Sequence, residues 1–330
     1  MSVEYAIIVK NRTRLEGLNA VFNNQSQAQF YIERQGGNFE DYEAEHEKFQ
    51  DSLNSLQMQL SKTIKHKIVE RVYLPSYIFS DKNLIIVIGQ DGLVANTAKY
   101  SKGIPIVAVN PDINRYDGLL LPFNTTNFME GVESVIANNY HSKNMRFAEA
   151  KLNDGQRLLA FNDLFIGAST HISARYKITF NKNIEEQSSS GLIVSTLAGS
   201  TGWMSSVFNM AYGITNEFDH NSKPNPSSKS KISSFSKSSY GPVGLAFPTI
   251  KEDELLFAVR EPFKSKRTQT GISAGIIRNQ NTLTIESLMP AGGVIFSDGV
   301  ESDFLKFNSG SIVTISIAEE TAKIVTHNAS

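Results

Sequence analysis

The stretch Leu84-Ile-Ile-Val-Ile-Gly-Gln-Asp-Gly-Leu93 joins five consecutive apolar residues to two glycines that flank one acid. Such a run predicts a strand buried on both faces, as in a parallel sheet. Gly89 and Gly92 would let the backbone turn and approach a ligand, and Asp91 would stand at the strand's carboxyl end, where open α/β sheets bind ligands. Residues 94–100 predict a helix whose first amides favour an anion such as phosphate. Because Asp-Gly is also a common tight-turn pair, the stretch alone leaves a simple turn open.

The composition excludes several classes of function. The 330 residues are enough for two domains, and a formal net charge of −1 argues against nucleic acid as a partner, since such binding needs clustered Lys and Arg. The chain has no cysteine, which excludes disulfides, thiolate zinc sites and a cysteine nucleophile. The first residues lack the charge order of a signal peptide, and no apolar run is long enough to span a bilayer. We therefore expect a cytoplasmic protein with no membrane partner.

Apolar runs alternate with helical patterns in the first third of the chain. Strands are predicted at residues 5–9, 84–88 and 104–109, and helices at 24–35 and 41–64. This alternation is typical of parallel strands joined by right-handed crossovers. The sequence therefore predicts an α/β, Rossmann-like domain over residues 1–123.

Residues 124–330 have a different character. After a predicted helix at 128–151, short strand patterns separated by turn residues indicate a β-rich, sandwich-like domain with one helix at 202–211. Residues 222–239 are rich in serine and lysine and almost free of apolar side chains, which predicts a mobile loop or, alternatively, a basic lid over phosphates. Strands are predicted at residues 158–161, 164–166, 174–180, 191–195, 254–259, 282–287 and 311–317.

Three further segments combine apolar strands with polar or glycine-rich ends. In Leu159-Ala-Phe-Asn-Asp-Leu-Phe-Ile-Gly167, a polar pair interrupts apolar residues and must be either satisfied or functional. Gly191-Leu-Ile-Val-Ser-Thr-Leu-Ala-Gly-Ser-Thr-Gly-Trp203 runs from a strand into small hydroxyl residues, which suit phosphate or ribose oxygens. Gly292-Gly-Val-Ile-Phe-Ser-Asp-Gly299 is another strand that ends in an acid and a glycine.

Taken in this order, the four segments resemble the NAD kinase family. The family's motifs read Gly-Gly-Asp-Gly-Thr, Asn-Glu, Asp-Gly-Leu-x-x-Ser-Thr-Pro-x-Gly-Ser-Thr-Ala-Tyr and a late Asp-Gly. The resemblance implies a nucleotide-binding domain over residues 1–123, a domain over 124–330 that completes an interdomain site, and a homo-oligomer. The implied reaction is phosphoryl transfer from ATP, with Mg²⁺, to a hydroxyl of NAD or a related nucleotide.

The resemblance also implies roles for particular residues. Asp91 matches the acid taken as the catalytic base or metal-orienting group, and no residue is predicted as a dedicated metal ligand. Residues that match the family's nucleotide-binding positions are Gly89, Gly92, Asn162, Asp163, Thr196, Gly199, Ser200 and Thr201.

Departures from the family motifs fall at the predicted site. Gln90 replaces a glycine, Leu93 replaces a threonine, and Ser190 stands where the family has an acid that contacts the acceptor nucleotide. Leu197 and Ala198 replace the proline and its neighbour, and Gly202-Trp203 replaces Ala-Tyr. Two alternatives therefore stay open. One is a kinase of the same fold with a different acceptor, such as a nucleoside, sugar or lipid. The other is a nucleotide-binding sensor without catalysis.

Overall fold

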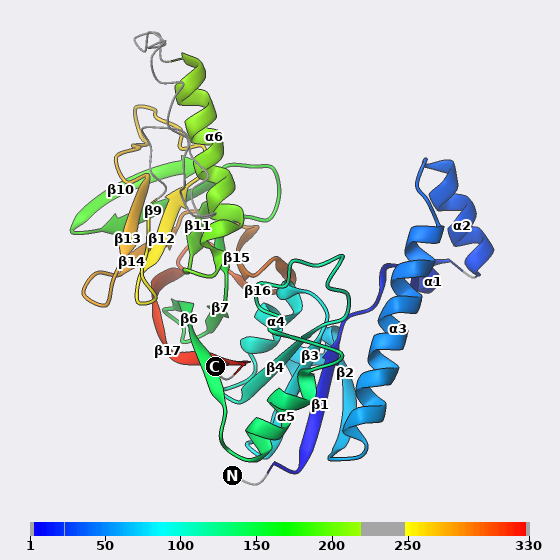
Figure 1. Ribbon diagram of the computed structural model, residues 1–330. Helices are drawn as coiled ribbons and strands as arrows, with labels where there is room; N and C mark the ends of the chain where they lie inside the picture. Colours follow the sequence, from blue (N-terminus) through cyan, green and yellow to red (C-terminus); the bar gives the residue numbers. More distant parts are fainter. Residues whose placement is uncertain (1–2, 23, 219–247, 328–330) are drawn as a thin grey trace, which may run out of the picture. The chain divides into compact units, whose positions relative to one another are not determined.

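The computed structural model describes residues 3–22, 24–218 and 248–327. The chain divides into two compact units: unit 1 is Met1–Met145 with Glu320–Ser330, and unit 2 is Arg146–Glu319. The predicted boundary between residues 123 and 124 falls inside unit 1, because helix α5 (Phe128–Ile136) packs on the sheet of that unit. Figure 1 labels the elements of both units.

A parallel sheet forms the centre of unit 1. In β3 every side chain from Leu84 to Ile88 is fully buried, as expected where both faces of a parallel sheet are covered. The predicted buried strand is therefore confirmed. The end of β17 (Ile312–Thr326) and the short β5 (Phe123–Asn124) also pair with β4 in parallel. The order of the four main strands is β4 (Pro105–Asn110), β3 (Asn83–Ile88), β1 (Tyr5–Lys10) and β2 (Lys65–Glu70).

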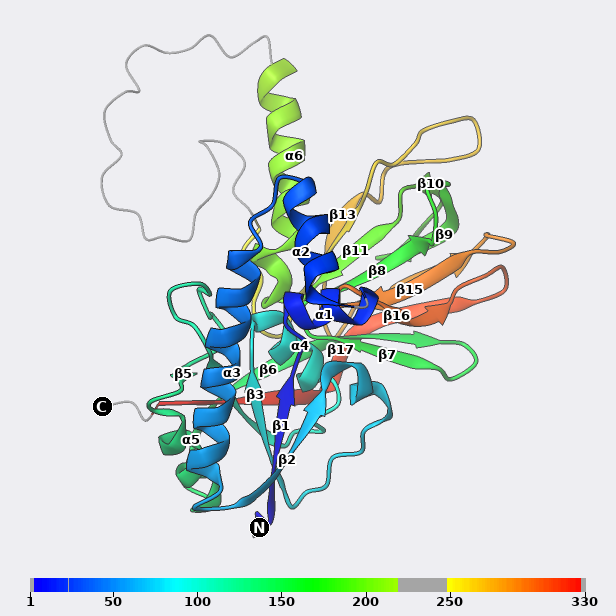
Figure 2. The same cartoon turned by 90° about the vertical axis from the view of Figure 1, so that its right-hand side faces the viewer.

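Helices α3 and α5 cover one face of this sheet (Figure 2). Leu53, Leu56 and Leu60 recur at helical spacing on α3 and pack against β1, β3 and β4, which confirms the predicted long amphipathic helix. The other helices of unit 1 are smaller, and α4 begins three residues before the predicted start. The bounds are α1 (Arg14–Val21), α2 (Gln25–Arg34), α3 (Glu40–Leu60), the 3₁₀ helix η1 (Arg71–Ser76) and α4 (Asp91–Ala98).

The helix predicted at residues 128–151 is wrong beyond residue 136. Helix α5 ends at Ile136, and Asn138 adopts a left-handed backbone with φ 54°. Strand β6 (His141–Leu152) follows, with Met145, Phe147 and other buried side chains alternating along much of its length. Its charged residues gave this strand an apparently helical composition.

Unit 2 contains two layers of antiparallel strands. One core cluster combines side chains of β8, β11 and β12 with side chains of β9, β14 and β17, so the layers pack face to face as in a sandwich. This confirms the predicted β-rich fold. One layer has the order β13 (Ala274–Ile277), β12 (Leu255–Val259), β11 (Leu192–Ser195), β8 (Asp163–Ala168), β15 (Gly293–Ser297) and β16 (Val300–Lys306). The other has the order β10 (Asn183–Ser189), β9 (Ala174–Phe180), β14 (Leu283–Ser287) and β17.

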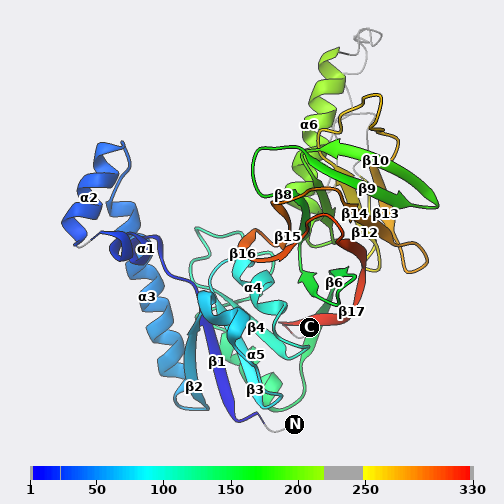
Figure 3. The same ribbon diagram turned by 180° about the vertical axis from the view of Figure 1, so that it is seen from behind.

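The remaining elements of unit 2 border these layers. Strand β7 (Arg157–Ala160) pairs with β6, and η2 (Gly199–Thr201) leads into α6 (Trp203–Phe218), the helix predicted from residue 202. The β9–β10 hairpin at the edge of one layer is clearest in Figure 3. The predicted mobile loop at residues 222–239 lies outside the described residues. Within the described ranges, no helix is both long and apolar enough to cross a membrane.

Candidate functional site

Asp91 is the first residue of α4, directly beyond the carboxyl end of β3. The Leu120 amide donates to its Oδ1 at 2.7 Å, and the Leu119 amide donates to its Oδ2 at 3.2 Å. These two bonds fix the orientation of the carboxylate. Each oxygen keeps a lone pair for another donor, since an ionised carboxylate has about four acceptor positions.

The two glycines beside Asp91 differ in their surroundings. A Cβ at Gly89 would lie 3.0 Å from Leu93 Cδ2, whereas a Cβ at Gly92 would meet no described atom within 4 Å. Gly92 is exposed in the first turn of α4, so the helix start is open on this side. Gln90, which replaces a glycine of the family motif, is also exposed. Leu93 is 5% exposed and packs inward.

In unit 2 the predicted Asn-Asp pair lies in a bend at residues 161–163, at the start of β8. Asp298 holds this bend: its carboxylate accepts backbone amides from Phe161 at 3.0 Å, Asn162 at 2.6 Å and Asp163 at 3.2 Å. The Asp298 amide donates to the Asp163 carbonyl at 2.9 Å. Asp298 was not predicted as a site residue, although its place in a strand-ending Asp-Gly pair marked the segment.

The predicted nucleotide loop packs directly on this bend. The Thr196 hydroxyl donates to the Phe161 carbonyl at 2.6 Å, and the Thr196 amide donates to the Asn162 carbonyl at 2.9 Å. A Cβ at Gly199 would lie 2.3 Å from the Asn162 carbonyl oxygen, so only glycine fits without a shift of the backbone. Ser200 is buried, and its hydroxyl donates to the Leu197 carbonyl at 2.7 Å. Thr201 is exposed. Unit 2 thus brings Asn162, Asp163, Thr196 and Gly199 together.

Asp163 has an unusual environment. The pKa of Asp163 is raised from the ordinary 3.8 to about 7: burial is the largest cause, a hydrogen bond with Ser195 opposes it, and the negative charge of Asp298 adds to the rise. Its Oδ1 is buried and lacks a hydrogen-bond partner among the described residues. A carboxyl at such a position is most stable when it is protonated or when its oxygens accept hydrogen bonds. A ligand hydroxyl or amine would therefore have Oδ1 of Asp163 as an acceptor.

Ser190 lines a pocket of about 880 Å³ that is formed within unit 2. The Trp203 and Phe165 rings stack with centroids 5.7 Å apart, Phe165 stacks on Phe296 at 4.9 Å, and the Arg260 guanidinium lies 5.5 Å from the Trp203 ring centroid. This wall can accept planar or apolar ligand groups. The sequence indicated Ser190 and Trp203 through their motif, whereas no sequence signal identified Phe165 and Phe296.

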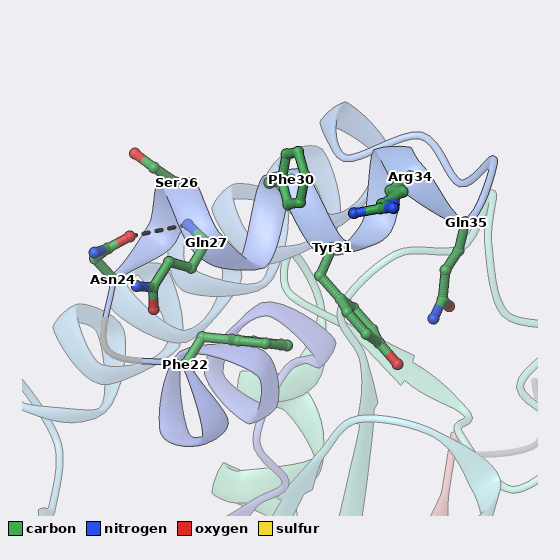
Figure 4. A pocket seen from close by; sticks show the side chains of 8 residues that line it. All are labelled: Phe22, Asn24, Ser26, Gln27, Phe30, Tyr31, Arg34 and Gln35. Atoms are coloured by element: carbon green, nitrogen blue, oxygen red, sulfur yellow. Dashed lines mark hydrogen bonds between the residues drawn. The ribbon is translucent and has the colours of Figure 1, made fainter.

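A second pocket, of about 790 Å³, is lined by residues of α2 and by residues just before and after this helix (Figure 4). None of the predicted site residues lies in this part of the sequence. Phe22, Phe30 and Tyr31 provide its apolar lining. As for metals, no group of three or more carboxylates and histidines in the described ranges is placed to hold an ion.

Comparisons with known proteins agree with this architecture. No protein-family model matches the chain. A curated NAD kinase from Heliobacterium modesticaldum is 31% identical over 149 residues, which span 42% of this chain and about half, 52%, of that relative.

Solved structures extend the likeness to nearly the whole chain. Yeast NADH kinase complexed with NADH matches with a TM-score of 0.57 at 10% identity, covering 99% of this chain and 85% of that one. An NAD kinase from Archaeoglobus fulgidus in complex with ATP matches with a TM-score of 0.51 at 14% identity, covering 97% and 92%. The predicted resemblance to the NAD kinase family is thereby confirmed, in fold over almost the entire chain and in sequence over part of it.

Proposed function

We propose that this protein is an ATP-dependent kinase of the NAD kinase type, which phosphorylates a hydroxyl of NAD or a related nucleotide. The observation that carries the proposal is the Asp91 carboxylate, oriented by two backbone amides at the open start of α4. The similarity to an NAD kinase over 149 residues supports it. The two structural neighbours are complexes with NADH and with ATP, which is consistent with nucleotide substrates here.

The proposed reaction assigns one task to each group. The acceptor hydroxyl oxygen attacks the γ-phosphorus of ATP, the bond from that phosphorus to the bridging β–γ oxygen breaks, and ADP leaves. Asp91 takes the proton from the attacking hydroxyl or orients it. The open amides at Gly92 face phosphate oxygens, and the bend with Asn162 and Asp163 accepts hydroxyl or amino groups of the nucleotide.

Mg²⁺ belongs to the proposal as a partner of ATP. Magnesium sites often use one or two carboxylates plus substrate phosphates, so a single carboxylate at the start of α4 suits such a site. Bound with ATP, the ion would neutralise charge on the phosphates. Asp91 is the carboxylate we propose to lie beside it. A homo-oligomeric state, which the resemblance to the family implies, and a cytoplasmic location, which the sequence led us to expect, complete the proposal.

A specific observation keeps a different acceptor as the second candidate. Ser190 carries no charge where the family has an acid, and it lines the aromatic pocket of unit 2. An acid would attract a positively charged ring such as oxidised nicotinamide, and a serine hydroxyl cannot supply that attraction. We therefore expect weaker preference for NAD over other nucleotides than in the family.

An acceptor screen tests the proposal. Purified protein with ATP and Mg²⁺ is incubated with nucleosides, dinucleotides including NAD and NADH, sugars and lipids, and products are identified by mass spectrometry. A chelator and a non-hydrolysable ATP analogue serve as controls. We expect a nucleotide heavier by one phosphoryl group. Phosphorylation of only sugars or lipids would establish the different acceptor, and nucleotide binding without turnover would establish the sensor.

A further inference from the structure

The proposed reaction gives no task to the late Asp-Gly pair, Asp298-Gly299. Asp298 and Gly299 form the two-residue turn between β15 and β16, with φ values of 53° and 68°. Two successive left-handed residues are typical of a tight hairpin, in which aspartate and glycine are common. The turn alone needs no carboxylate at residue 298, because asparagine or glycine adopts the same backbone.

The Asp298 carboxylate forms its hydrogen bonds with a different segment of the chain, residues 161–163. It accepts the backbone amides of Phe161, Asn162 and Asp163, and its own amide donates to the Asp163 carbonyl. These four bonds join residues that are more than 130 positions apart in the chain. Three amides that converge on one charged acceptor form a rigid anion nest, which fixes the bend in a single conformation.

The bend in turn positions the predicted nucleotide residues. Thr196 bonds to the carbonyls of Phe161 and Asn162, and Gly199 packs against the Asn162 carbonyl. A shift of the bend would therefore displace the start of η2 as well as Asp163. The negative charge of Asp298 also acts on Asp163, and the neutral Ser195 hydroxyl faces the same carboxyl. Among the described residues, these are the groups that act on the Asp163 charge.

We propose that Asp298 is a positioning residue, which holds the bend that presents Asn162 and Asp163 to a ligand and places its own charge beside the Asp163 carboxyl. Its contribution to catalysis rests on the proposed kinase function. Its effects on the bend and on Asp163 do not, so they are measured first without any substrate.

The first test compares wild type with D298N in full-length protein. An asparagine would place an NH₂ group against at least one of the three amides. We expect the amides of residues 161–163 to exchange with deuterium roughly tenfold faster or more, as for the loss of a hydrogen bond to a charged group. The matched control is D154N, the same substitution in the β6–β7 hairpin, where Asp154 accepts the Gln156 amide. Unchanged exchange at 161–163 in D298N would overturn the positioning role.

The second test measures the charge effect by ¹³C-carboxyl NMR titration, with D163N identifying the Asp163 signal. D298N removes a neighbouring negative charge and should move the midpoint to lower pH, whereas S195A removes a hydrogen bond and should move it to higher pH. Simple loosening of the bend would admit water and lower both midpoints. Shifts of equal sign in the two variants, or no shift in D298N, would contradict the proposal.

A kinetic measurement then links the inference to catalysis. If the protein phosphorylates a nucleotide, the pH dependence of the acceptor KM should move in D298N in the same direction as the NMR midpoint, and D154N should leave it unchanged. Failure of phosphorylation with the NMR and exchange results intact would reject the proposed function alone. Intact phosphorylation with an unmoved pH profile would reject the role of Asp298 in it.

Discussion

At neutral pH the burial of the Asp163 carboxyl conflicts with its ionisation. The residue is partly buried, and its Oδ1 is shielded from solvent and lacks a partner in the described ranges, so the ionised form is disfavoured. The sequence predicted that a polar pair inside an apolar segment is satisfied or functional. The structure satisfies the backbone of the pair through Asp298 and leaves Oδ1 of Asp163 without a partner among the described residues.

This conflict predicts a pH-dependent stability. The folded-state pKa of about 7 lies above the ordinary 3.8, so the contribution of Asp163 to stability is fully present below about pH 4 and is lost as pH rises through 7. Asparagine imitates the protonated form. The melting temperature of D163N relative to wild type should therefore rise between pH 5 and pH 8, by roughly 2–4 °C for each kcal/mol of relief.

Calorimetry at both pH values checks this prediction. D154N is the control, because Asp154 lies in an exposed turn whose hydrogen bonds lower its pKa. It should gain no stability between pH 5 and 8. A melting difference between D163N and wild type that stays constant over this range would show that Asp163 does not titrate as described.

Helix α4 shows how an element can be open to a ligand without being unstable. Gly92 has free space around a Cβ and no positive φ, so alanine should fit and add up to about 1 kcal/mol of helix stability. An added methyl group would nevertheless stand where phosphate oxygens are proposed to approach. We predict that G92A melts no lower than wild type and loses phosphoryl transfer by roughly tenfold or more.

Gly17 supplies the matched control for this variant. It lies in helix α1, it also has no described atom within 4 Å of a Cβ, and none of the predicted site residues belongs to that helix. G17A should gain similar stability and keep full activity. If G92A also keeps full activity, phosphate does not approach the start of α4.

The elements that sequence predicted best are those in which burial dictates composition. Strand β3 is an uninterrupted apolar run because both of its faces are covered. Strand β10 was not predicted, since its polar sequence NIEEQSS is held by pairing with β9 rather than by its own pattern. The helix predicted beyond residue 136 failed for a related reason: β6 has one face exposed and carries charges on it.

At the scale of the whole molecule, fold and motif carry different information. The solved structures of an NADH kinase and an NAD kinase share this fold at 10% and 14% identity, because many sequences can fill the same cores. The motif residues are restricted by chemistry, so the roles of Asp91, Asn162 and Thr196 are predicted from their match to the family motifs and stay predictions. Asp298 could not be assigned from sequence, since its role depends on amides that lie far away in the chain.

Transfer of the γ-phosphoryl group from labelled ATP to the nucleotide acceptor tests the central claim most directly. Wild type should form a labelled nucleotide in the presence of Mg²⁺, and D91N should do so about 10²-fold more slowly, as for loss of a general base. D117N, which removes an exposed acid near the loop that binds Asp91, is the control and should transfer at the wild-type rate. The account is contradicted if wild type labels no nucleotide, or if D91N matches it with unchanged melting.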